Sequence, residues 1–219
     1  MKNIAIEPAI HVAAPKYKAL IISCNITNSV YNDDLWQELN AEIEIFRKRF
    51  IITDINKLPG IYEMRQLYKK LGKDPNRYRP SAEALCRRVL KEKDLYKINT
   101  LVDCINLISI HTCFSIGGFD LEKINGDLKL GIGEAGEEYE AIGRGLLNIE
   151  GLPVYRDEKG GIGTPTSDEE RTKIDLHTKI LLMIINSAGG TIGLGEALEW
   201  SKRVLTDYVQ AKELVYYQI

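Results

Sequence analysis

The spacing of apolar residues changes along this chain, and that change constrains the fold more than any other feature. Before residue 112, apolar residues recur with helical spacing in four segments, namely 33–50, 58–72, 82–93 and 98–110. After residue 126, short β-type segments alternate with glycine turns, at 127–132, 138–143, 152–157 and 177–187. Two more β-type segments, 3–12 and 17–26, precede the first helix. This mixed order is typical of an α+β fold with flanking helices rather than of a repeated βαβ unit.

Length and composition favour one domain over residues 1–219. The chain has 219 residues, of which 44% are hydrophobic, and a chain of this size buries a full core. Residues 1–58 are predicted to form a strand, a second strand and a helix, and a last helix is expected over about 194–219.

Charge and cysteine usage exclude several classes of protein. The formal net charge of -2 and a pI near 6.0 exclude a uniformly basic coat protein, so a site for a polyanion must be local. The four cysteines form no CxxC pair and the three histidines have no zinc spacing, so buried, reduced thiols are predicted and no metal or other cofactor is expected. No segment resembles a membrane span or a signal peptide, which predicts a cytoplasmic protein without a membrane partner.

The helix predicted over 98–110 carries a polar stripe. Asn99, Asp103 and Asn106 fall at i, i+4 and i+7, within a sector of roughly 60°, opposite an apolar face. Two interpretations are open. The stripe lines a cleft, or it braces the fold, with Asp103 paired to Arg79 or Arg87 in a buried network.

A basic segment lies between residues 65 and 93. Its ten cations are Arg65, Lys69, Lys70, Lys73, Arg77, Arg79, Arg87, Arg88, Lys91 and Lys93. Tyrosines interleave with them, as on surfaces that contact phosphates and stack on bases. The alternative is a solvated face of two helices.

Two glycine-rich stretches were candidate anion sites. "GIGEAG" at 131–136 matches a dinucleotide-binding pattern, but acidic residues crowd it and favour a turn between strands. "KGGIGTPTSDEERTK" at 159–173 predicts either an exposed turn or a loop whose backbone amides, over 160–164, donate to an anion or an oxyanion.

Several of these motifs occur together in one known family. "RPSAEALCRRVL", "INTLVDCIN", "GGFDLEKINGDLKLGIGEAGEEYEAIG" and "LPVYRDEKGG", in this order, resemble the B3/B4 domain of the phenylalanyl-tRNA synthetase beta chain, and most of all its stand-alone relatives. The resemblance covers about 60–187. It implies the α+β fold, with mixed sheets, that this module shares with a tRNA-lysidine synthetase domain. It also implies tRNA or aminoacyl-tRNA as partner, because the synthetase module hydrolyses tRNA mischarged with tyrosine.

The resemblance assigns roles to individual residues, with two departures. Gly117 stands where the module has its editing histidine, and Thr166 stands where an editing glutamate would be. Thr166 is therefore expected to orient water by its hydroxyl, and Asp103 or Asp120 to act as base if exposed in the cleft. The substrate pocket is expected to comprise Asn99, Asn106, Gly117, Gly118, Gly161 and Thr164. The RNA-binding residues are expected to be Arg79, Arg87, Arg88 and Lys91.

Two functions follow from these assignments. One is a stand-alone hydrolase that removes a wrongly attached amino acid from tRNA in trans. The other is a binding module without chemistry, for tRNA or for a free amino acid, which the missing histidine and glutamate favour.

Overall fold

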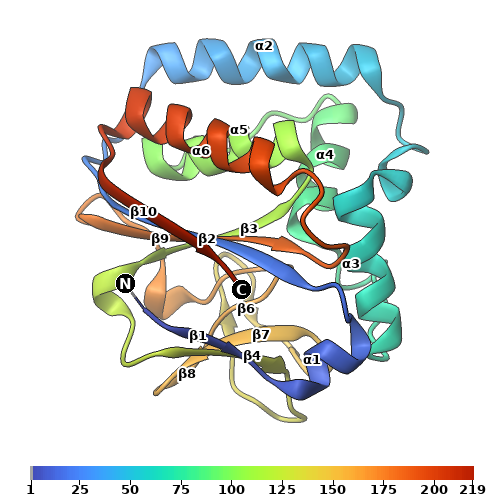
Figure 1. The fold of residues 1–219 in the computed structure, drawn as a ribbon. Helices are drawn as coiled ribbons and strands as arrows, with labels where there is room; N and C mark the ends of the chain where they lie inside the picture. Colours follow the sequence, from blue (N-terminus) through green and yellow to red (C-terminus); the bar gives the residue numbers. More distant parts are fainter. Residues whose placement is uncertain (1) are drawn as a thin grey trace.

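Two facing β-sheets form the frame of the computed structural model, which describes residues 2–219 (Figure 1). One sheet has the order β10-β2-β9-β3, with all neighbours antiparallel. Its strands are β2 (Lys18–Asn25), β3 (Ser115–Asp120), β9 (Ile180–Ser187) and β10 (Lys212–Gln218). The other sheet has the order β1-β4-β7-β8, with a parallel β1–β4 pair. Its strands are β1 (Ile4–Ile6), β4 (Leu128–Ile132), β7 (Pro153–Asp157) and β8 (Gly160–Gly163).

The strand β9 is buried on both faces of its sheet. Leu181 and Met183 point into a core shared with the helices, while Leu182 and Ile184 point into a second core between the two sheets. Because successive side chains alternate between the faces, a strand covered on both sides is apolar at every position. This explains the unbroken apolar run of β9.

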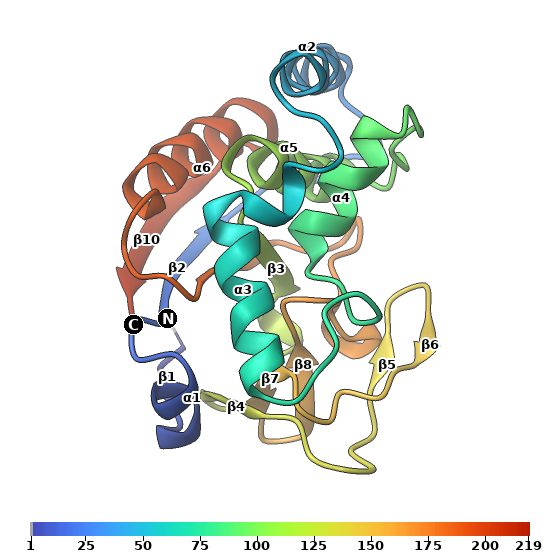
Figure 2. The ribbon, with the colours of Figure 1, turned by 90° about the vertical axis from the view of Figure 1, so that its right-hand side faces the viewer.

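Helices cover the outer face of this sheet. α5 (Thr100–Thr112) and α6 (Leu194–Val209) lie on the sheet, and α2 (Asp33–Arg49) packs outside α5 (Figure 1). α3 (Pro59–Lys70) runs along the side of both sheets and contributes to both cores (Figure 2). α4 (Ser81–Leu90) packs against α5 and β3.

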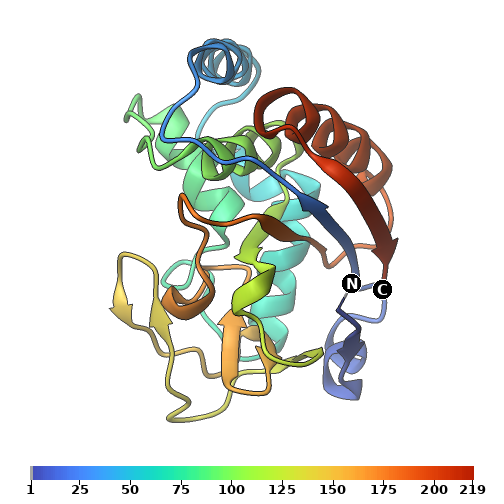
Figure 3. The ribbon, with the colours of Figure 1, turned by 90° about the vertical axis from the view of Figure 1, so that its left-hand side faces the viewer.

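The remaining elements are short. They are the helix α1 (Pro8–Ala13), the 3-10 helices η1 (Ile55–Lys57), η2 (Leu121–Lys123) and η3 (Glu170–Thr172), and the strands β5 (Glu140–Ala141) and β6 (Gly145–Leu146). β5 and β6 form a hairpin that projects on the same side of the molecule as α4 (Figures 2 and 3). Its turn contributes to the site described below.

Two predicted elements differ from the structure. The strand expected over 3–12 ends at Ile6, because Pro8 fixes a backbone angle that suits the first turn of a helix and α1 begins there. The helix expected over 194–219 ends at Val209, and Gln210 has a left-handed backbone (φ 54°). The chain then returns as β10, which pairs with β2.

The predicted fold class and the other predicted helices are confirmed. The α+β class and the helices near 33–50, 58–72, 82–93 and 98–110 are observed. "GIGEAG" ends β4 and continues into a turn, without a following helix. All four cysteines are free thiols, and three of them are buried. Within residues 2–219, no helix has the length and apolarity to cross a membrane.

Candidate functional site

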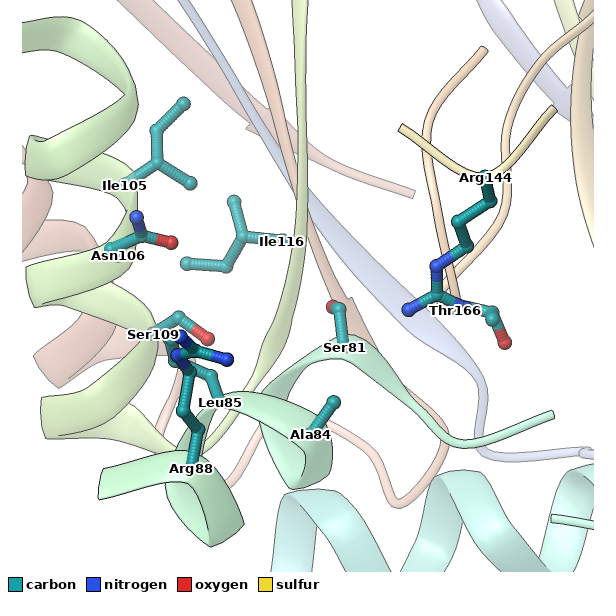
Figure 4. Close-up of a pocket in the computed structure, with 10 residues that line it drawn as sticks. All are labelled: Ser81, Ala84, Leu85, Arg88, Ile105, Asn106, Ser109, Ile116, Arg144 and Thr166. Carbon is teal, nitrogen blue, oxygen red and sulfur yellow. The ribbon is translucent and has the colours of Figure 1, made fainter. Parts of the chain in front are cut away.

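A cavity of about 310 Å³ lies between α4, α5 and β3 and is closed on one side by two loops (Figure 4). Its volume is at the low end of the range for small-molecule sites, which suits one amino acid or one nucleotide. The residues that line it are Ser81, Ala84, Leu85, Arg88, Ile105, Asn106, Ser109, Ile116, Arg144 and Thr166.

The sequence of α4 directs one of its faces into the cavity. Ser81, Ala84, Leu85 and Arg88 are spaced i, i+3, i+4 and i+7, so they lie on one side of the helix. The opposite face carries buried residues such as Cys86 that anchor α4 in the core. The helix therefore presents hydroxyl, apolar and cationic groups in turn along the cavity.

Thr166 belongs to a tight turn that is fixed to α4. The Thr164 hydroxyl oxygen accepts hydrogen bonds of 3.1 Å from the backbone N–H groups of Thr166 and Ser167. The N–H of Ser81 donates to the carbonyl oxygen of Pro165 (2.8 Å), and the Thr166 hydroxyl lies 2.9 Å from the hydroxyl of Tyr68. Thr166 is only 2% exposed, and this network holds its side chain in place.

Two arginines approach the cavity from opposite walls. Arg144, in the β5–β6 turn, extends towards the cavity beside Thr166, and Arg88 lies on the other side beside Ser109 (Figure 4). The Nε of Arg88 donates to the carbonyl oxygen of Asp94 (2.7 Å), and its guanidinium lies 4.2 Å from the ring centre of Tyr96. The N–H of Arg144 donates to the carbonyl oxygen of Ala141 (3.0 Å), whereas its guanidinium makes no hydrogen bond or ion pair with any residue of 2–219. No lining residue is acidic, so the cavity is electropositive.

Asp168 is a carboxyl group close to the Thr166 turn that sequence reasoning missed. Its Oδ2 accepts a 3.1 Å hydrogen bond from the N–H of Gly118. Its Oδ1 lies in a notch between two glycines, since a methyl group at Gly117 or Gly163 would come within 3.2 or 3.1 Å of it. Burial of the carboxyl group raises the pKa of Asp168 to about 7, although the Gly118 N–H partly opposes this. A side chain at Gly117 would meet the ring of Phe119 at 2.7 Å and would also crowd this carboxylate.

The polar stripe of α5 does not share one environment. Asn99 is the N-cap, and its side chain accepts from the N–H of Val102 (3.0 Å). Asp103 is fully buried and accepts a 2.8 Å hydrogen bond from the indole N–H of Trp36, while its Oδ1 has no partner in the described chain. Burial raises the pKa of Asp103. Of the three, Asn106 lines the cavity.

The predicted pairing of Asp103 with Arg79 or Arg87 is wrong. Both arginines turn instead to Glu83 on α4, which is 1% exposed. Arg87 Nε donates to Glu83 Oε1 (2.8 Å), and buried Arg65 donates to Oε2 (2.8 Å). Arg79 Nε lies 3.4 Å from Oε1. Glu83 is the brace. It lies one helical turn before Arg87 on α4, and Arg79 approaches it from the segment that precedes the helix.

The other expected pocket residues lie outside the cavity lining. Gly117, Gly118 and Gly161 are buried in strands, where an added side chain would meet the rings of Phe119 and Tyr139 or the side chain of Ile105. Thr164 supports the Thr166 turn. The expected exposed turn at 159–173 is instead a buried strand, β8, followed by this turn, because its glycines pack against aromatic rings.

The remaining expected residues have other contacts. Asp120 is 4% exposed and caps η2 through the N–H of Glu122, while it accepts from the hydroxyl of Thr178 (3.0 Å). Lys91 follows the last turn of α4 and is exposed. Over residues 2–219, no cluster of three or more His, Cys, Asp or Glu side chains is arranged to hold a metal ion.

Sequence reasoning missed Arg144, which lines the cavity, and Asp168, which lies near the Thr166 turn and outside the lining. Asp168 belongs to an acidic stretch in which its neighbours Glu169 and Glu170 look equivalent, and Arg144 lies alone between two glycines, where no motif singles it out. The pairing of Ala141 with Glu169, and the hydrogen bond from the N–H of Ile142 to the carbonyl of Asp168 (3.0 Å), bring the two segments together. A single sequence carries no signal of that pairing.

Comparison with known proteins gives the family. Residues 63–192, more than half of the chain, match the family model described as the B3/4 domain. The fold is similar to a crystal structure of an N-terminal fragment of the phenylalanyl-tRNA synthetase beta-subunit from Pyrococcus horikoshii, with a TM-score of 0.52 and 14% identity. The alignment covers 99% of this chain and 53% of that one, so this chain spans about half of the length of that fragment. The comparison with curated proteins finds no match. The chain belongs to the B3/4 domain family, as its motifs indicated.

Proposed function

We propose that this protein binds tRNA and hydrolyses the ester bond of a wrongly attached amino acid in trans. The observation that supports this most is the electropositive cavity, where the Thr166 turn meets α4 and α5. It combines hydroxyl and amide groups with an apolar wall, which suits an acyl group at the end of a polyanion.

Ester hydrolysis requires a base for the attacking water. Asp168 is suited to this role, because a carboxyl group with a pKa of about 7 is partly ionised at neutral pH and still accepts a proton. Its carboxylate takes one proton from water while the water oxygen bonds to the ester carbon. The bond to the ribose oxygen then breaks, and that oxygen takes the proton back from Asp168. Thr166, two residues away, orients the water.

Incubation of purified protein with a panel of mischarged tRNAs tests the proposal. Deacylation of at least one pair should exceed the rate without protein. Thr166→Ser should keep the activity, and Thr166→Val should lose it, with both variants checked for an unchanged fold by circular dichroism. Absence of deacylation for every pair would refute hydrolysis.

The second candidate is a module that binds tRNA without chemistry. It is favoured by the cavity lining, whose ionisable side chains are both arginines. It predicts tRNA affinity without deacylation, together with a steep decrease of affinity with salt as counterions are released. An amino-acid-binding module would instead show stabilisation by free amino acids in thermal melts.

A further inference from the structure

We infer that the cavity binds the phosphate of a single terminal nucleotide between Arg88 and Arg144, and does not bind a free amino acid. This deepens the proposed function and rests on it, since that function brings the 3′ end of an RNA to the cavity. It names the group that enters and the two residues that recognise it.

The first argument is the balance of charge in the cavity. Two guanidinium groups line it and no acidic side chain does. A free amino acid carries an ammonium group, which two arginines would repel and no carboxylate of the lining would bind. A phosphate would find two cations, and guanidinium groups bind phosphate oxygens through paired, charge-assisted hydrogen bonds.

The second argument is that the two arginines are free to bind. Arg88 uses its Nε for the carbonyl oxygen of Asp94 and is stacked over Tyr96, so its terminal nitrogens keep their donors in a fixed orientation. Arg144 is exposed, and its guanidinium makes no hydrogen bond or ion pair within residues 2–219. The neighbouring arginines Arg79 and Arg87 are different, because the buried carboxylate of Glu83 holds both.

The third argument is the shape and chemistry of the space between them. Leu85, Ile105 and Ile116 form an apolar wall, and Ser81 lies between the two arginines (Figure 4). An apolar wall suits the face of a base, and the hydroxyl of Ser81 suits a sugar oxygen. The volume of about 310 Å³ suits one nucleotide rather than a longer segment.

Titration with small ligands, followed by heteronuclear NMR, tests the inference on the full chain. The probes are adenosine 5′-monophosphate, adenosine, inorganic phosphate and L-aspartate. The monophosphate should bind at least about tenfold more tightly than adenosine, because charge-assisted hydrogen bonds to the phosphate are lost in the nucleoside. Inorganic phosphate should shift the same resonances more weakly, and aspartate should not shift them.

Arg144→Gln is the decisive variant, because the guanidinium of Arg144 has no polar contact in the described chain whose loss would affect folding, and the backbone bond to Ala141 is kept. It should weaken binding of the monophosphate about tenfold and leave adenosine unchanged. Arg88→Gln should have the same effect. The matched control is Arg49→Gln, which removes an exposed charge at the end of α2, outside the cavity, and should change neither affinity.

Equal affinity for the monophosphate and adenosine would overturn the inference. So would binding of aspartate in preference to the monophosphate, which would identify a carboxylate metabolite as ligand. The two proposals fail separately. If the protein deacylates tRNA but binds the monophosphate independently of Arg144, the proposed function stands and this inference fails. If it binds the monophosphate through Arg144 but deacylates no tRNA, this inference stands and the protein is a binding module.

Discussion

The indole N–H of Trp36 donates a 2.8 Å hydrogen bond to Oδ2 of the fully buried Asp103. This contact links α2 to α5 and leaves Oδ1 of Asp103 without a partner in the described residues. Burial dominates and raises the pKa of Asp103, although the Trp36 hydrogen bond and the charge of Lys97 favour the ionised form. An ionised carboxylate at this position therefore costs free energy of folding.

Asp103→Asn should accordingly stabilise the protein at pH 8. The amide oxygen keeps the bond to Trp36 while the buried charge is removed. Because the folded-state pKa is raised, the parent loses stability as pH rises from the unfolded-state value through the folded-state value. The gain should therefore shrink as pH falls towards about 4, near the pKa of a free carboxyl group. Thermal melts at both pH values measure it, and a variant that melts lower than the parent at pH 8 would contradict it.

Glu83→Gln should destabilise the protein strongly. Glu83 is 1% exposed and compensates three arginines, of which Arg65 is itself 7% exposed. Removal of the charge leaves the buried guanidinium of Arg65 without a counter-ion, which costs about 3 to 5 kcal/mol in comparable pairs. Urea denaturation measures the loss. Glu199→Gln is the matched control, because Glu199 forms an exposed pair with Lys202, and it should change stability by less than about 1 kcal/mol.

Arg87 and Arg88 are adjacent in sequence and should behave differently in tRNA binding. Arg87 is held by Glu83 and Asn56, whereas the terminal nitrogens of Arg88 point to the cavity. Arg88→Ala should weaken binding and flatten the slope of log affinity against log salt by about 0.7 to 0.9 for one lost phosphate contact. Arg87→Ala should lower the melting temperature and leave that slope unchanged. Equal slopes for the parent and Arg88→Ala would mean that Arg88 contacts no phosphate.

Asp168 should make both stability and deacylation depend on pH near 7. Its folded-state pKa is raised to about 7, so the stability it contributes is complete at low pH and is lost as pH rises from about 4 to about 7. Asp168→Asn should remove this dependence from thermal melts, whether or not the protein is an enzyme.

If Asp168 is the base, deacylation should increase with pH through about 7, and Asp168→Asn should slow it by about 10² to 10⁴-fold. A rate that does not change with pH between 6 and 8, or a variant as active as the parent, would exclude Asp168 from the reaction.

The fold could be predicted largely from local patterns. The spacing of apolar residues predicts the helices and the β-type segments, because each element buries one side or one stripe of its own residues. β9 was recognised as a buried strand by its apolar run. The last strand, β10, was missed, because its residues alternate little between apolar and polar and it is defined by pairing with β2.

The site could be predicted less well, because its residues come from segments that are distant in sequence. The motifs identified α4, α5 and the Thr166 turn, and Asn106, Thr166 and Arg88 do line the cavity. The partner of each charge could not be read from spacing. Asp103 and Glu83 both lie at helical spacing from other polar residues, so spacing alone does not identify their partners. The packing of each helix decides that Glu83 accepts a hydrogen bond from Arg65 and Asp103 accepts one from Trp36.

The sequence by itself determined the α+β class, most helices, the free thiols and the family of this protein, since these depend on the order and periodicity of neighbouring residues. The tertiary structure alone decided which cations are free. The charges of Arg79 and Arg87 are compensated by the buried carboxylate of Glu83. Arg88 and Arg144 line opposite sides of a cavity that has no acidic side chain in its lining. Compensation of charge depends on distances between side chains on different elements, and only the packing of those elements sets these distances.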